Sequence, residues 1–128
     1  AEEIAAAAQH PPRAGTLSVA DISAYEPRKL EPLCVDYRGT DYCGPPPPSS
    51  WVAVGMTLEM LESIPYPGDD RMQNWALFTE AQRLAYADRD QFVADDSAIA
   101  VPIAGLLNPS YISERATQIS SDQAAATI

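Results

Sequence analysis

Residues 37–50 read YRGTDYCGPPPPSS, and this stretch predicts more about the fold than any other part of the chain. An aromatic-rich run with a glycine at its middle is typical of a β-hairpin. The prolines that follow exclude a helix and a central strand, because each lacks an N–H donor and fixes φ. Two serines then stand where they can accept hydrogen bonds from the first free N–H groups of a helix beginning near Trp51. We therefore expect a stiff structural corner, holding two layers of a larger fold in register, at Pro46, Pro47, Pro48, Ser49 and Ser50.

The hairpin strands are predicted at residues 30–36 and 40–44, and each contains one cysteine. If Arg38 and Gly39 form a two-residue loop, Cys34 faces Cys43 in a non-hydrogen-bonded pair, where Cα atoms approach most closely and a disulfide is allowed. If Gly39 instead sits in a bulge, the pairing slips by one residue and the sulfurs diverge. The two cysteines would then be small buried hydrophobic residues. The sequence leaves both alternatives open.

Helices are predicted on both sides of this corner, which makes the chain an α+β protein. The expected ranges are 1–9, 19–25, 51–64, 71–92 and 110–118, with residues 93–107 irregular or a short strand and residues 120–128 a frayed tail. Ser18 and Asp21 form a candidate capping box, and Asn108-Pro109 is a helix start signal. Asp69 or Asp70 is expected to cap the longest helix.

The two central helices carry wide apolar faces. In the helix over 51–64, we expect Val54, Leu58 and Leu61 on one side, with Met56 and Met60 widening the stripe. In the helix over 71–92, apolar residues cover more than half of the circumference, which predicts a helix buried on two sides. The residues concerned are Met72, Trp75, Phe78, Leu77, Ala81, Leu84 and Ala85.

Composition limits the possible partners. The chain has 128 residues, 46% of them hydrophobic, which fits one globular unit. Its net charge of −10 argues against nucleic acids and anionic membranes as partners, whose phosphates would be repelled, and solubility is the simpler account of the acidity. No apolar run reaches the ~20 residues that span a bilayer. No signal peptide is visible, and the first residue, Ala1, suggests a processed or excised piece of a longer polypeptide.

Neither a metal nor a cofactor site is expected. The only histidine, His10, stands before two prolines and is interpreted as a surface turn residue, whereas zinc needs three or four converging ligands. An acidic cluster near the end of the long helix invites comparison with a calcium loop. The pattern of a calcium loop is not met, because Phe92 and Ile99 stand at two positions that need oxygen ligands. The glycine that such a loop needs at its sixth position is also missing. A helix end followed by a solvated acidic loop is the better interpretation of Asp88, Asp90, Asp95 and Asp96.

No complete catalytic constellation is present either. Ser49 and Ser50 lack a Gly-x-Ser-x-Gly context and an evident base, so helix capping is the better interpretation. The proline run formally contains Pro-x-x-Pro, but no basic residue beside it would orient such a ligand. Asp88 and Arg89 are adjacent on a helix and point about 100° apart, so each is expected to contact another part of the fold. Arg89 is either an anchor for a partner carboxylate or a helix C-terminal cation.

A series of short motifs runs along the chain in a fixed order. Before the proline corner it comprises Thr16, Leu17, Asp21, Ile22 and Tyr25, then Glu31 and Pro32, and then Tyr37 to Gly39. From the corner onward it comprises Pro46 to Ser50, Leu61 and Glu62, Glu80 and Ala81, Leu84 to Arg89, Val101 and Pro102, and finally Leu106, Leu107, Tyr111 and Arg115. Over residues 1–119 this series resembles the C-terminal part of the large subunit of γ-glutamyltransferases (γ-glutamyltranspeptidases). Two departures stand out. Trp51 and Val52 replace two glycines, and Trp75 and Ala76 stand where many members have a histidine. Trp51 would fill space that glycine leaves for a partner or substrate.

The resemblance implies a fragment of an N-terminal-nucleophile hydrolase with an αββα sandwich. In that family the precursor cleaves itself, and the new N-terminal threonine of the small subunit attacks the γ-glutamyl group of glutathione or a related amide, with its own α-amino group as base. None of the family's catalytic residues falls within 1–128, so the fragment alone is expected to be inactive. The implied partners are the remaining large subunit and the small subunit, and the implied compartment of the parent is periplasmic or extracellular.

Two alternatives remain. The parent could be a related acylase or amidase of the same superfamily, which the loss of the two glycines favours, or the chain could be a self-contained, non-catalytic interaction module. As a fragment, the chain is expected to expose an apolar face along the Trp75/Phe78 or the Leu77/Leu84 side and to self-associate there.

Overall fold

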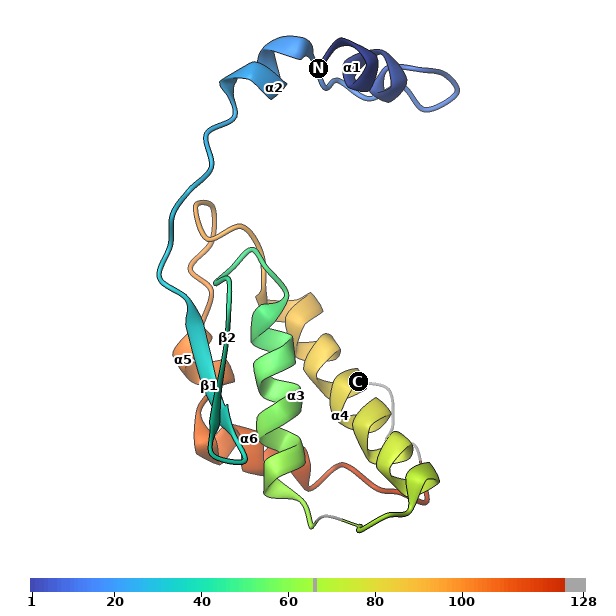
Figure 1. Cartoon of the computed structure of the whole chain (residues 1–128), viewed down its shortest axis with the longest axis vertical. Coiled ribbons are helices and arrows are strands. Elements are labelled where there is room, and N and C mark those ends of the chain that lie inside the picture. Colours follow the sequence, from blue (N-terminus) through green and yellow to red (C-terminus); the bar gives the residue numbers. More distant parts are fainter. Residues whose placement is uncertain (66, 124–128) are drawn as a thin grey trace.

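The computed structural model describes residues 1–65 and 67–123, and it is a mixture of helices and one two-stranded sheet (Figure 1). The α+β class is confirmed. The elements are α1 (Glu2–Ala8), α2 (Val19–Ala24), β1 (Leu33–Tyr37), β2 (Thr40–Gly44), α3 (Trp51–Ser63), α4 (Arg71–Phe92), α5 (Ile103–Leu106) and α6 (Pro109–Ala116).

The hairpin has the register of a two-residue loop. Arg38 and Gly39 both have positive φ angles, 54° and 74°, as a type I′ turn requires. Tyr37 pairs with Thr40, and Glu62 of α3 accepts a hydrogen bond from the Arg38 N–H at 3.2 Å. Strand β1 begins at Leu33 rather than at residue 30 as predicted, because Pro32 has no N–H to contribute to a ladder.

The core is built where α3 contacts α4, α6 and β1. Val52, Met56, Met60 and Leu84 are fully buried in it. The hairpin reaches this core through Val35, which lies over Gly55; a Cβ at position 55 would stand 2.9 Å from Val35 Cγ1. The absence of a side chain at Gly55 therefore permits β1 to lie close against α3.

The predicted inner face of α3 is wrong in part. Val54 is 41% exposed, and the buried residues are Val52, Ala53, Gly55, Met56, Thr57 and Met60. Helix α3 contacts α4, α6 and β1, so most of its circumference is covered. A single apolar stripe therefore does not identify which of its residues remain exposed.

Helix α4 has the predicted bounds, and Asp70 caps it by accepting a hydrogen bond from the Gln73 N–H at 3.0 Å. The prediction that α4 is buried on two sides is wrong for the described residues. Its buried residues begin only at Ala81, whereas Met72 is 80% exposed and Trp75 is 57% exposed. Helix α3 is the principal neighbour of α4, so one side of its first half stays open.

The segment after α4 contains the one-turn helix α5, which was not predicted because a single turn has no periodicity to detect. Helix α6 begins at Pro109, and the Asn108 side chain caps it by accepting from the Ser110 N–H at 2.9 Å. In the described part of the tail, Ser121 accepts a hydrogen bond from Gln73 at 3.1 Å. The remainder of the predicted tail, 124–128, lies outside the described residues.

Helices α1 and α2, with the segment that connects them to β1, form an arm that arches away from the rest of the chain (Figure 1). Within it, Ser18 and Asp21 make the predicted capping box of α2. An exposed ion pair of 3.0 Å, from Arg28 to Asp96, connects the arm to the loop after α4.

Candidate functional site

The proline corner joins β2 to α3, and Pro47 is fully buried in it. Ser49 Oγ accepts a hydrogen bond from the Trp51 N–H at 3.2 Å, as a capping serine would. Ser50 is the N-cap residue, but the prediction that its side chain caps the helix is wrong. With ψ at 10°, Ser50 is not in the extended conformation that directs a side chain onto the helix N–H groups. Its hydroxyl instead accepts from Nε of Arg89 at 3.2 Å.

Trp51 locks the corner to the hairpin. Its indole N–H donates to the Leu33 carbonyl at 2.6 Å, and its ring lies against Gly44, where any Cβ would overlap ring atoms. The indole therefore fills the space beside Gly44 at the start of α3.

Changing Gly44 to alanine is expected to destabilise the chain by about 1–3 kcal/mol, because the added methyl group must displace the Trp51 ring. Gly105→Ala is the matched control, since its Cβ would meet only Pro102 at 3.9 Å. Urea unfolding followed by circular dichroism measures both. Equal midpoints for the two variants would contradict the packing described for Trp51.

Cys34 and Cys43 face each other in the hairpin and form a disulfide, with their Cα atoms 4.1 Å apart. Of the two alternatives left open by the sequence, the structure has the two-residue loop and the bonded pair. Both residues are exposed, so they are not small core residues.

Removing this disulfide by the double change Cys34→Ala and Cys43→Ala is expected to cost about 2–3 kcal/mol, because closing a loop of this length restricts the unfolded chain. The comparison is between urea midpoints with and without a thiol reductant. The unsubstituted 128-residue chain should lose stability when the reductant is added, and the urea midpoint of the double variant should not change. If the reductant left the urea midpoint of the unsubstituted chain unchanged, the prediction would be contradicted.

A buried ion pair joins α4 to α6. Asp88 is fully buried and accepts hydrogen bonds from two nitrogens of Arg115, of which Nε lies 3.0 Å from Oδ2. Arg115 Nε also reaches the Tyr111 hydroxyl at 3.2 Å. The hydrogen bonds to Asp88 raise the pKa of Arg115, and burial raises the pKa of Tyr111. The sequence predicted that Asp88 contacts another part of the fold but did not identify Arg115, which is 27 residues away. The interpretation of Asp88 as a solvated acidic residue is wrong, because this side chain is fully buried.

The other acidic residues near the end of α4 have separate partners. Asp90 pairs with Arg89 at 2.8 Å, Asp96 pairs with Arg28, and Asp95 accepts from the Ser97 N–H and hydroxyl. These hydrogen bonds from Ser97 lower the pKa of Asp95. Within residues 1–65 and 67–123, no three His, Cys, Asp or Glu side chains converge as metal ligands would.

The remaining candidates of the sequence lie at the surface. His10 is exposed, and its Nδ1 lies 2.7 Å from the Pro11 carbonyl oxygen in the turn after α1. Arg89 contacts Ser50 and Asp90 in the last turn of α4, where a cation also complements the helix dipole. None of the helices found in the described part of the chain has the length and hydropathy to cross a bilayer.

Glu59 lines a cavity of about 240 Å³ between the hairpin, α3 and α6, together with Asp36 and Glu62. Its Oε2 is buried and has no hydrogen-bond partner among the described residues. Burial raises the pKa of Glu59. The structure therefore holds this carboxyl group in a place that disfavours its charge.

Glu59→Gln is expected to raise the urea midpoint at neutral pH. A carboxyl whose pKa is higher in the folded state binds its proton more tightly there, so its stability contribution is present at acid pH and is lost as pH rises through the folded-state pKa. The gain from Gln should therefore shrink as pH falls below the ordinary glutamate range. Glu114→Gln, on an exposed part of α6, controls for the change in net charge. If Glu59→Gln raised the urea midpoint equally at neutral pH and below the ordinary glutamate range, the raised pKa of Glu59 would be contradicted.

Comparison with known proteins gives one consistent result. The family model described as Gamma-glutamyltranspeptidase matches residues 1–128. The chain is 35% identical to the Acylase ACY 1 proenzyme of Pseudomonas sp. (strain V22), over 86% of this chain and 20% of that protein. It is 32% identical to the Glutathione hydrolase proenzyme of Escherichia coli (strain K12), over 97% of this chain and 22% of that protein. The chain thus spans about a fifth of these curated relatives.

A solved structure shows the same arrangement of elements. The Helicobacter pylori gamma-glutamyltranspeptidase matches with a TM-score of 0.76 and 27% identity, over 88% of this chain and 33% of that chain.

Proposed function

Because the chain belongs to the gamma-glutamyltranspeptidase family, we propose that it is a structural segment of the large subunit of an enzyme that transfers the γ-glutamyl group of glutathione or a related amide to water or amino acids. The observation that carries the proposal is the match of the family model to the whole chain. The 32% identity to a protein named glutathione hydrolase proenzyme supports the choice of acyl group.

The polar residues of the described chain support a scaffolding role. Ser49 and Ser50 bond to a helix N–H and to Arg89, and the Asp88 carboxylate is buried against Arg115. These groups are engaged inside the fold and are poorly placed to attack a substrate. The parent would supply the nucleophile, an N-terminal threonine with its own amine as base, from another part of its sequence.

Chain lengths of the relatives support processing of the parent. A similar share of this chain covers 20% of the Pseudomonas proenzyme but 33% of the solved H. pylori chain. The solved chain is therefore the shorter of the two, as expected if a precursor is cut and this segment stays on one product. The remaining large subunit and the small subunit are the proposed partners, and an oxidising compartment, periplasmic or extracellular, is consistent with the hairpin disulfide.

The test is an assay of the complete parent and of the 128-residue chain with a γ-glutamyl anilide. We expect the parent to release the aniline and the chain alone to release none. Replacing the threonine that begins the downstream subunit with alanine should abolish both precursor cleavage and turnover. Turnover of the anilide by the purified chain alone would overturn the scaffolding role.

An acylase parent is the second candidate. Two observations favour it, namely the 35% identity to a protein named acylase and the Trp51 indole that fills the start of α3. The same parent preparation should then be assayed with a β-lactam that carries an acyl side chain. Faster cleavage of that amide than of the γ-glutamyl anilide would select the acylase.

A further inference from the structure

The two faces of the hairpin differ in character. On the inner face, Val35 is buried over Gly55, and the Trp51 ring lies against Gly44. Because successive residues of a strand point to opposite sides, both cysteines belong to the outer face. The residues of the outer face are all exposed, and they are Cys34, Asp36, Asp41 and Cys43. The disulfide of this chain therefore lies where small solutes reach it.

Two carboxylates flank this disulfide. Asp36 pairs with Asp41 in the register, two residues along the ladder from the Cys34–Cys43 pair and on the same face. Side chains that are diagonal to each other across such a ladder lie about 7–8 Å apart. The Asp36 carboxylate is held at this end of the hairpin, because its Oδ1 accepts a hydrogen bond from the Gly39 N–H at 3.2 Å. An anion that approaches the disulfide is therefore repelled by two negative charges.

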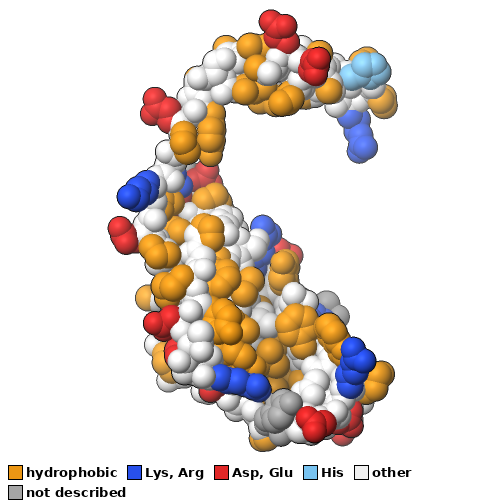
Figure 2. Space-filling view, viewed as in Figure 1, with side chains coloured by type: hydrophobic (Ala, Val, Ile, Leu, Met, Phe, Trp, Pro, Cys, Tyr) orange, Lys and Arg blue, Asp and Glu red, His pale blue; other side chains and the backbone are white. Residues whose placement is uncertain are grey.

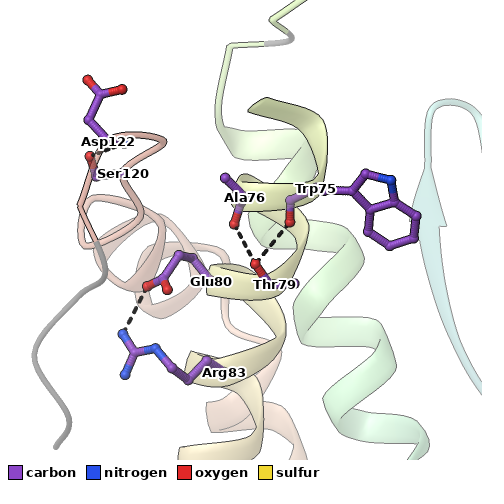
Figure 3. A network of polar contacts seen from close by, with 7 residues as sticks. All are labelled: Trp75, Ala76, Thr79, Glu80, Arg83, Ser120 and Asp122. Carbon is purple, nitrogen blue, oxygen red and sulfur yellow. Dashed lines mark hydrogen bonds and ion pairs between the residues drawn. The ribbon is translucent and has the colours of Figure 1, made fainter. Parts of the chain in front are cut away.

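The cations near the hairpin do not offset these charges. The guanidinium of Arg38 lies over the ring of Tyr37, 5.0 Å from its centroid, and Tyr37 belongs to the inner face. Arg83 is ion-paired within α4 at 3.0 Å, and Figure 3 shows it on the helix that α3 separates from the hairpin. In the segment before β1, Lys29 is accompanied by Glu31. The outer face of the hairpin is therefore acidic.

An exposed disulfide reacts with small thiols by exchange. The thiolate of the small molecule attacks one cysteine sulfur, the Sγ–Sγ bond breaks, and the other cysteine leaves as a thiolate that takes up a proton. A second small thiolate then attacks the resulting mixed disulfide at the sulfur of the small molecule. This step releases the second cysteine and forms the small-molecule disulfide. Two small thiols are thus oxidised, and the protein disulfide is reduced to two thiols.

We propose that the Cys34–Cys43 disulfide is an exchange site that selects small thiols by charge, and that the dipeptide thiol released by the proposed reaction reduces it faster than glutathione does. The identity of these thiols rests on the proposed function. Removing the γ-glutamyl group from glutathione frees an ammonium group on the carbon beside the thiol-bearing carbon. The attacking thiolate of the dipeptide therefore carries one negative charge fewer, and the two carboxylates repel it less.

This exchange connects the product of the proposed reaction to the stability of the scaffold. Reduction opens the covalent link of the hairpin and leaves Val35 and Trp51 to hold it on α3. The hairpin leads directly into the proline corner, so its loosening is transmitted to the start of that helix. Accumulated product thus weakens the segment that its release depends on.

The experiment measures the second-order rate constant with which each thiol reduces the disulfide, in the full-length parent and in the 128-residue chain. Alkylation of the released thiols, followed by mass spectrometry of the peptide covering residues 33–44, reports the reaction at this site. Each rate constant is divided by that of the same thiol with the uncharged bis(2-hydroxyethyl) disulfide, so that differences in intrinsic thiol reactivity cancel. The ratio of the dipeptide value to the glutathione value is the charge selectivity.

The charge selectivity is expected to be at least about threefold at low ionic strength, because two carboxylates act on the one charge by which the thiols differ. It should fall toward one at ~1 M salt, where the Debye length is about 3 Å. The double change Asp36→Asn with Asp41→Asn should also bring it close to one. Asparagine at position 36 retains an oxygen that can accept the hydrogen bond from Gly39.

The double change Glu2→Gln with Glu3→Gln is the matched control. It removes the same amount of charge from α1, which lies on the arm and far from the hairpin (Figure 1). Figure 2 shows acidic side chains both on this arm and on the part of the chain that contains the hairpin. The control variant should keep the charge selectivity of the unsubstituted protein.

Three outcomes would overturn the proposal. The first is a charge selectivity of about one in the unsubstituted protein. The second is a selectivity that survives the change of Asp36 and Asp41, or that falls equally when Glu2 and Glu3 are changed. The third is a parent whose disulfide resists both thiols although the 128-residue chain reacts, which would show that the rest of the enzyme covers this face.

Failure of the proposed function gives a different result. A parent that does not cleave the γ-glutamyl anilide does not release the dipeptide thiol by its own reaction. Its disulfide should nevertheless show the charge selectivity when the two thiols are added, because the selectivity depends on Asp36 and Asp41 and not on turnover.

Discussion

Replacing Asp88 with alanine is expected to lower the free energy of unfolding by about 3–5 kcal/mol. Asp88 is fully buried, and Arg115 retains little exposure, with 12% of its side chain accessible. Removing the carboxylate leaves the guanidinium of Arg115 in a site without a compensating charge, and the cost of that buried charge dominates. Urea unfolding at neutral pH, followed by circular dichroism, measures the change.

Asp90→Ala is the control for this prediction. Asp90 is two residues away on the same helix and is also ion-paired, but its side chain is 70% exposed, so its removal should cost less than about 0.5 kcal/mol. The double change Asp88→Leu with Arg115→Met should cost less than the two single changes together, because it removes both charges and leaves none unpaired. A midpoint for Asp88→Ala equal to that of Asp90→Ala would show that the pair is not buried in solution.

The second large effect is expected for Met56→Ala, at about 2–5 kcal/mol. The side chain of Met56 is fully buried between α3 and its neighbours, so its truncation removes apolar contacts and leaves a cavity. Met72→Ala provides a control of the same residue type, because Met72 is 80% exposed and its truncation should change stability by less than about 0.5 kcal/mol.

The comparison of these two methionines tests the orientation of both helices. If Met72→Ala proved as costly as Met56→Ala, the first half of α4 would be covered in solution by a part of this chain or by another copy. The dependence of the Met72→Ala effect on protein concentration would then distinguish these two cases.

The local features of this fold could be predicted from sequence because the residues that decide them are adjacent. Arg38-Gly39 predicts a turn, but the sequence left open whether it is the two-residue loop that the structure has or a bulge at Gly39, and only the former brings Cys34 to Cys43. The start of α6 follows from Asn108 and Pro109, and the bounds of α4 follow from Asp70 and a long periodic pattern.

The features that depend on three-dimensional neighbours were not predictable in the same way. Val54 and Met72 fit an apolar stripe, yet both are exposed because the described chain offers no element to cover them. The partner of Asp88 lies on a helix whose position no local pattern gives. Ser50 is at the N-cap position of α3, but its hydroxyl accepts a hydrogen bond from Arg89 in the last turn of α4 and does not cap the helix.

The Asp88–Arg115 pair also has an evolutionary consequence. The two residues belong to different motifs of the chain, one in α4 and one in α6, yet neither side chain is acceptable at its position without the other. A sequence that exchanges one of them must pass through an intermediate with an isolated buried charge. Selection should therefore treat the two codons as one unit, and lineages should keep the pair intact or replace both members together.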